Sequence, residues 1–124
     1  MDRRQFEQTL TEVYGIPSEH PFARHPSVAV FRHAENHRWF AAIMTIPACK
    51  LTAGAEGTVD IVNLKCAPEM LDTLWGMDGI YPAYHMNKSH WITATLDGRV
   101  SAETLAFLVG VSFDLTATKL HPKK

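Results

Sequence analysis

Residues 27–46, SVAVFRHAENHRWFAAIMTI, contain two segments with the composition of β-strands. The first covers residues 27–32 and the second residues 38–46, and both are rich in β-branched and aromatic side chains. Such side chains favour an extended backbone because they pack well on a pleated surface. Residues 34–37 between the segments are long enough only for a short turn. The sequence therefore predicts an antiparallel hairpin.

Helical periodicity precedes this hairpin and returns twice after it. The first predicted helix covers residues 3–14, and its apolar stripe consists of Phe6, Leu10, Val13 and Tyr14. A second helix is expected to begin at Pro68, a residue favoured in the first turn, and to end at Gly76. Its inner face is predicted to consist of Met70, Leu71, Leu74 and Trp75. A third helix is expected to follow Ser101, which suits the capping position, and to run through Leu115.

Three more strands are predicted at residues 58–64, 80–84 and 90–96, which gives the element order α-β-β-β-α-β-β-α. Blocks of hairpin-linked strands with helices between them are typical of α+β proteins. We therefore expect a single two-layer α+β domain over residues 1–124, with an antiparallel sheet of about five strands and three helices on one face. The last residues, 119–124, are expected to fray.

Composition and charge narrow the class of protein. The 124 residues are 46% hydrophobic and 20% charged, with a net charge of −1. This balance excludes a strongly basic protein but permits a local basic face. The polar start MDRR and the absence of a long apolar run predict no membrane partner. Cys49 and Cys66 form no disulfide framework, so we expect reduced thiols and a cytoplasmic location.

Motifs for catalysis are missing. The chain contains no G-x-S-x-G, no G-x-G-x-x-G and no P-loop pattern. Its seven histidines converge at most in pairs, and a pair is half of a tetrahedral metal site. We therefore expect no enzyme activity, no catalytic residue, no metal and no cofactor. Cys66 is expected to be buried, without a histidine or carboxylate partner.

The densest group of polar and aromatic side chains is YPAYHMNKSHW, residues 81–91. It joins two predicted strands, and loops on a rigid sheet commonly display binding groups. The tip combines Asn87, which suits a left-handed turn, with the mobile ammonium of Lys88. The candidate binding residues are Tyr84, His85, Asn87, Lys88, His90 and Trp91. In the structural alternative, Tyr84 and Trp91 pack in the core and Asn87 only makes the turn.

Longer motifs run through most of the chain. The most specific is HMNKSHW at residues 85–91, which ITATLDG follows at residues 92–98. The others are FARHP (22–26), the Arg38-Trp39-Phe40 strand, NLKCAPE (63–69), GIYPAYH (79–85) and the helix VGVSFDL (109–115). Together they closely resemble the MmcQ/YjbR-like proteins. The resemblance implies a compact α+β fold related to frataxin-like and secretion-chaperone-like architectures.

The same resemblance implies DNA binding through a double wing of β-hairpins, here the turn at Glu35-Asn36 and the loop at Asn87-Lys88. The first functional hypothesis is therefore a DNA-binding accessory protein with a local basic face. The residues of this face would be Arg24, Arg32, Arg38, Lys65 and Lys88. Because Glu35 lies in the first wing and the net charge is slightly negative, we expect weak, salt-sensitive binding.

The alternative hypothesis is a non-catalytic module that recognises a small anionic ligand, or a peptide of a protein partner, through the HMNKSHW region. The placement of Lys65 and Lys88 distinguishes the two hypotheses. An open basic face favours DNA, whereas a cavity beside His85 and His90 favours a ligand. In both cases we expect a monomer.

Overall fold

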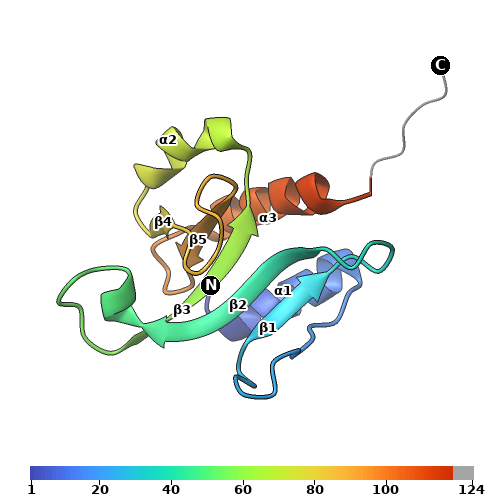
Figure 1. Ribbon diagram of the computed structural model, residues 1–124, viewed down its shortest axis with the longest axis horizontal. Coiled ribbons are helices and arrows are strands. Elements are labelled where there is room, and N and C mark those ends of the chain that lie inside the picture. The colour runs from blue at the N-terminus through green and yellow to red at the C-terminus, as the bar shows by residue number, and fades with distance from the viewer. Residues whose placement is uncertain (119–124) are drawn as a thin grey trace.

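The computed structural model describes residues 1–118, and its elements follow the predicted order (Figure 1). The helices are α1 (Arg3–Tyr14), α2 (Leu71–Trp75) and α3 (Ala102–Thr116). The strands are β1 (Ala29–Arg32), β2 (Trp39–Pro47), β3 (Thr58–Lys65), β4 (Ile80–Pro82) and β5 (Trp91–Thr95). Two short 3-10 helices are η1 (Ala48–Lys50) and η2 (Pro68–Met70). The tail that was expected to fray lies outside the described residues.

The five strands form one antiparallel sheet in the order β1-β2-β3-β5-β4. β1 and β2 form the predicted hairpin, and a register shift between Phe31 and Arg32 marks a β-bulge. In the middle of the sheet, Asn63 of β3 pairs with Thr93 of β5. The predicted α+β fold with a five-stranded antiparallel sheet is therefore confirmed.

Helices α1 and α3 cover one face of the sheet and lie behind the strands in Figure 1. The core between these two layers includes Phe6, Leu10, Phe40, Val62 and Leu105. Among residues 1–118, no helix is both long enough and apolar enough to cross a membrane.

Two residues of the predicted apolar stripes lie outside this core. The side chain of Val13 is 67% exposed at the end of α1, and that of Trp75 is 41% exposed at the end of α2. Helix α2 has only five residues, little more than one turn. It can therefore turn Leu71 and Leu74 inward, but not the next residue as well.

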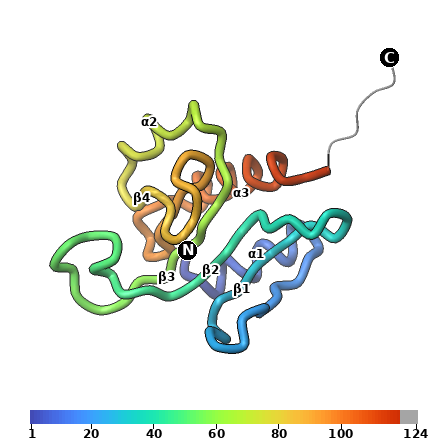
Figure 2. Tube along the Cα trace, in the orientation of Figure 1, coloured from blue at the N-terminus to red at the C-terminus, as the bar shows by residue number. Residues whose placement is uncertain are grey.

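The face of the sheet opposite α1 and α3 also contains buried side chains. Because side chains alternate along a strand, Asn63, Thr93 and Thr95 lie on this second face, and all three are buried. The chain between β4 and β5 loops back beside β3 (Figure 2), and its Tyr84 carbonyl accepts a hydrogen bond from Asn63. The sheet thus provides a rigid support for the loop that contains HMNKSHW.

Candidate functional site

The start of the β4–β5 loop is fixed to the sheet by a closed set of hydrogen bonds. The Tyr84 amide donates to Oγ1 of Thr93 (2.8 Å), and Nδ2 of Asn63 donates to the Tyr84 carbonyl (2.9 Å). The Thr93 hydroxyl in turn donates to Oδ1 of Asn63. Because Asn63 and Thr93 are buried, their polar atoms have no water to replace these partners. Both backbone groups of Tyr84 are therefore held in place.

The tip of the loop has a defined turn geometry. Oδ1 of Asn87 accepts from the Ser89 amide (2.8 Å), and the Asn87 carbonyl accepts from the amides of His90 (3.1 Å) and Trp91 (2.9 Å). Before this turn, His85 has a φ of 59°, a left-handed conformation that costs a non-glycine residue free energy. The imidazole of His85 stacks on the Tyr84 ring, with ring centroids 3.9 Å apart. Asn87 therefore makes the turn, as expected, but the left-handed residue of the loop is His85 and not Asn87.

A cavity of about 280 Å³ lies between this loop and η1, and we call it the loop cavity. Lys50, Tyr81, Tyr84, His85 and Lys88 are among its lining residues. None of the described residues that line it is acidic. Two lysines and a histidine therefore line one small space, with no acidic residue among its described lining residues to balance them.

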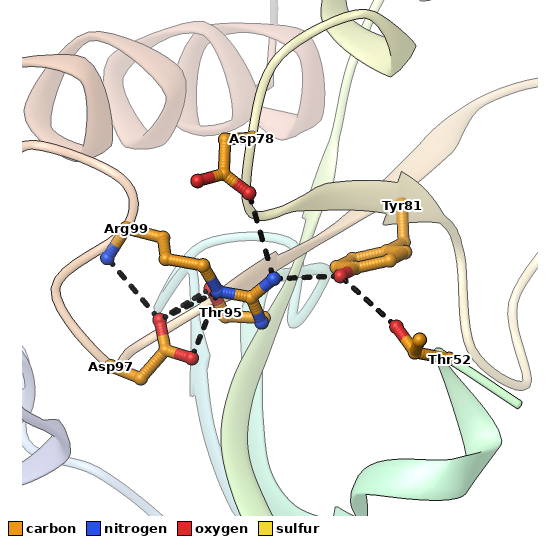
Figure 3. Close-up of polar contacts among 6 residues, drawn as sticks. All are labelled: Thr52, Asp78, Tyr81, Thr95, Asp97 and Arg99. Carbon is orange, nitrogen blue, oxygen red and sulfur yellow. Dashed lines mark hydrogen bonds and ion pairs between the residues drawn. The ribbon is translucent and has the colours of Figure 1, made fainter. Parts of the chain in front are cut away.

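The wall of the loop cavity at Tyr81 is braced by a polar network around Arg99 (Figure 3). Nη1 of Arg99 donates to the Tyr81 hydroxyl (2.8 Å), and Nε of Arg99 lies 3.0 Å from Oδ2 of Asp97. Asp78 lies 3.6 Å from the same guanidinium. The Tyr81 hydroxyl also lies 3.3 Å from that of Thr52, and hydrogen bonds with Thr52 and then Arg99 lower the pKa of Tyr81. Arg99 therefore fixes Tyr81, and two aspartates balance the charge of the Arg99 guanidinium.

A larger cavity of about 530 Å³ lies beside this network, with Thr52, Asp97 and Arg99 among its lining residues. Its charged lining residues are Glu56, Asp60, Asp97 and Arg99. Three acidic side chains against one arginine make it a poor site for an anion. The loop cavity is the better candidate because its charge has one sign.

Some of the residues proposed from the sequence meet at the loop cavity and others do not. Tyr84, His85 and Lys88 line it, whereas Lys65, Asn87, His90 and Trp91 are not among its lining residues. Lys65 and Trp91 are half-buried and face each other across the β3–β5 ladder. The Lys65 amide donates to Oγ of Ser112 (2.9 Å). Trp91 thus belongs neither to the main core nor to the cavity.

The three arginines proposed for DNA contact lie in or next to β1 and β2 in the chain, at the edge of the sheet opposite β4. Arg32 forms an ion pair with Glu19 (2.8 Å), so its charge is already balanced. Arg24 and Arg38 are exposed. The turn between β1 and β2, expected as a wing, is docked on α3. His33 Nε2 donates to the Phe113 carbonyl (3.1 Å), and Asn36 Nδ2 donates to the Thr116 carbonyl (2.8 Å).

Three residues that contribute to this site were not predicted from the sequence. Asn63 and Thr93 hold the loop, and Lys50 completes the positive lining. An amide in the middle of the apolar strand VDIVNLK is a signal that could have indicated Asn63, because Asn is depleted in strands. Lys50 has no comparable signal, since only the path of the chain between β2 and β3 brings it to the cavity.

Cys66 is buried, as expected, at the end of β3. Burial raises the pKa of its thiol, which disfavours the reactive thiolate. Cys49, in η1, is exposed. The absence of enzyme activity stays a prediction.

The chain is similar to a known protein family and to bacterial proteins. The YjbR family model matches residues 10–115. The uncharacterised protein YyaQ of Bacillus subtilis is 35% identical over 116 residues, which cover 94% of this chain and 98% of YyaQ. The uncharacterised protein YjbR of Escherichia coli K12 is 33% identical over 64 residues, 51% of this chain and 54% of that protein.

Solved structures of other bacterial proteins are also similar to this chain. A crystal structure of a Pseudomonas syringae protein superimposes with a TM-score of 0.91 at 43% identity, covering 94% of this chain and all of that one (100%). The Deinococcus radiodurans protein DR2400 gives a TM-score of 0.64 at 28% identity, covering 87% of this chain and 75% of that one. The family match spans most of the chain, and YyaQ aligns along almost its whole length. The chain therefore belongs to the YjbR family.

Proposed function

We propose that the protein is a binding module whose loop cavity takes a small anionic ligand, of the size of a phosphate or carboxylate group with a short substituent. The observation that carries this proposal is the lining of the cavity: Lys50, Lys88 and His85 meet there without an acidic residue among the described lining residues. Ammonium groups bind phosphate and carboxylate oxygens through short, charge-assisted hydrogen bonds.

The support beneath the cavity favours a binding role over a merely structural one. Asn63 and Thr93 fix the backbone of Tyr84 before any ligand arrives. A preformed site binds more tightly because less conformational entropy is lost on binding. The left-handed backbone of His85 is the kind of local strain that is often found at ligand sites.

Replacing Lys50 or Lys88 with alanine is expected to weaken binding of inorganic phosphate by about fivefold each, since a partly exposed charge contact contributes ~1 kcal/mol. The measurement is an NMR titration in which phosphate is added to isotope-labelled protein and the amide chemical shifts are monitored. The shifts are expected at residues 48–52 and 81–90. Because screening by salt weakens exposed charge contacts, affinity should also fall as sodium chloride is added.

Lys65→Ala is the matched control for these variants. It removes a lysine that neighbours the loop on the sheet but does not line the cavity. Its phosphate affinity should equal that of the wild type. If phosphate shifts no amide of the loop, or if Lys65→Ala weakens binding as much as Lys88→Ala, the anion site is wrong.

A second candidate function, weak duplex DNA binding, is supported by the placement of the two predicted wings. The strand pairs Arg32–Trp39, Lys65–Trp91 and Pro82–Ile92 lie at one end of the sheet. The β1–β2 turn and the β4–β5 loop therefore leave the sheet at the same end. Exposed cations accompany both segments, with Arg38 at the first and Lys88 at the second.

This candidate gives a different result from the anion site. Arg38→Ala and Lys88→Ala should each reduce the slope of log affinity against log salt by ~0.9 on random duplex DNA. Lys50→Ala, which changes the cavity, should leave that slope unchanged. Fluorescence anisotropy of labelled duplex at several salt concentrations measures it. An unchanged slope for Arg38→Ala would remove the double-wing hypothesis while the phosphate titration still tests the cavity.

A further inference from the structure

Exposed apolar side chains gather on the surface formed by α2 and the first half of α3. Among residues 1–118, the large hydrophobic side chains that are exposed are Val13, Phe22, Trp75, Met77 and Phe107. Two of these five, Met77 in the turn after α2 and Phe107 in α3, line the same groove between these elements, whereas Trp75 is not among its lining residues. Phe107 is 61% exposed, which is a high value for a phenylalanine in the middle of a helix. Two large exposed apolar side chains that line one groove indicate a candidate interaction site.

A groove of about 570 Å³ runs between these two helices, and we call it the α2–α3 groove. Its apolar lining includes Met70, Leu74, Met77 and Phe107. Methionine side chains are flexible and polarizable, so they adapt to apolar partners of different shape. The groove shares no lining residue with the loop cavity, so it is independent of the proposed anion site.

The charge at the edge of the groove indicates what kind of segment fits it. The charged residues in its lining are Glu69, before α2, and Glu103, in the first turn of α3. Both are acidic and exposed, and no basic residue is among the described lining residues. A partner that buries apolar side chains here therefore gains if it places Lys or Arg next to them.

We propose that the α2–α3 groove docks an amphipathic segment of a partner protein, with apolar side chains in the groove and lysines or arginines beside Glu69 and Glu103. Phe107 and Met77 supply the apolar contact at the centre. The two glutamates select the charge of the partner. This is the helix-in-groove mode of recognition, in which apolar anchors recur at helical spacing.

The test uses two matched helical peptides of fourteen residues, with leucines at i, i+3, i+4 and i+7. One peptide carries lysines at its polar positions and the other carries glutamates. The full chain is titrated with each peptide, and NMR amide shifts are followed. The lysine peptide is expected to bind and to shift residues 69–77 and 103–108, whereas the glutamate peptide is expected to bind at least about tenfold more weakly.

Variants separate apolar contact from charge. Phe107→Ala should lower the affinity for the lysine peptide about tenfold or more, because aromatic anchors at the centre of a contact dominate affinity. Glu69→Gln with Glu103→Gln should reduce the preference for lysine over glutamate. Val13→Ala removes an equally exposed apolar side chain on α1 and should change nothing. All four positions are exposed, so these variants should fold.

Three results would overturn the proposal. Equal binding of both peptides would show a nonspecific apolar surface. Shifts confined to other parts of the chain would place binding elsewhere. Sedimentation that shows a dimer of the wild type, lost in Phe107→Ala, would assign the groove to a second copy of this chain.

Discussion

Replacing Gly79 with alanine is expected to lower the free energy of unfolding by about 2–5 kcal/mol, from backbone strain and overpacking together. Gly79 has a φ of +85°, which L side chains rarely adopt. A Cβ at this position would lie 2.7 Å from Cγ2 of Val100 and 2.9 Å from Oγ1 of Thr95. Both of these neighbours are buried, so they have little room to move. Equilibrium denaturation in urea measures the loss.

Gly98→Ala is the control that separates the two causes. Gly98 also has a positive φ, +94°, but nothing lies within 4 Å of the position its Cβ would take. The decrease in the free energy of unfolding of Gly98→Ala should therefore come from backbone strain alone, about 1–2 kcal/mol. Equal losses at the two glycines would contradict the close packing argued for Gly79. That packing matters for the site because Gly79 connects Asp78, which faces Arg99, to Tyr81.

The elements of the fold could be predicted because each has a local cause. β-branched and aromatic residues define the β1–β2 hairpin, and Ser101 accepts a hydrogen bond from Thr104 as the predicted cap of α3. The ends of elements depend on tertiary contacts instead. The strand predicted to reach residue 84 ends at Pro82, because the Tyr84 amide bonds to the Thr93 side chain rather than to a neighbouring strand.

The candidate site could be predicted only in part. The sequence indicates the loop, since its polar and aromatic residues are adjacent in the chain. It does not indicate that Lys50 lies near Lys88, because that neighbourhood depends on the whole sheet. The exposure of a side chain also depends on tertiary structure: Trp75 and Val13 follow the helical period, yet both side chains are exposed.

Replacing Asn63 with alanine is expected to lower the free energy of unfolding by about 2–4 kcal/mol, since each buried polar group left without a partner costs ~1–3 kcal/mol. The groups affected are the Tyr84 carbonyl and the Thr93 hydroxyl. The variant should also release the β4–β5 loop from the sheet and weaken phosphate binding at least as much as Lys88→Ala does. Urea denaturation, hydrogen exchange of amides 84–91 and the phosphate titration measure these three effects.

Two threonines of β5 provide a matched pair of substitutions that distinguishes release of the β4–β5 loop from a general loss of stability. Thr93 and Thr95 are both buried on the same face, but Thr93 bonds to Tyr84 and Asn63 whereas Thr95 donates to Asp97 (2.9 Å). Thr93→Val should therefore speed exchange in the loop and weaken phosphate binding, as Asn63→Ala does. Thr95→Val should leave loop exchange at its wild-type rate even if it destabilises the protein. If both valine variants change loop exchange equally, the Asn63–Thr93 pair does not position the loop. Loop release without loss of phosphate binding would instead mean that the lysines bind anions without a preformed cavity.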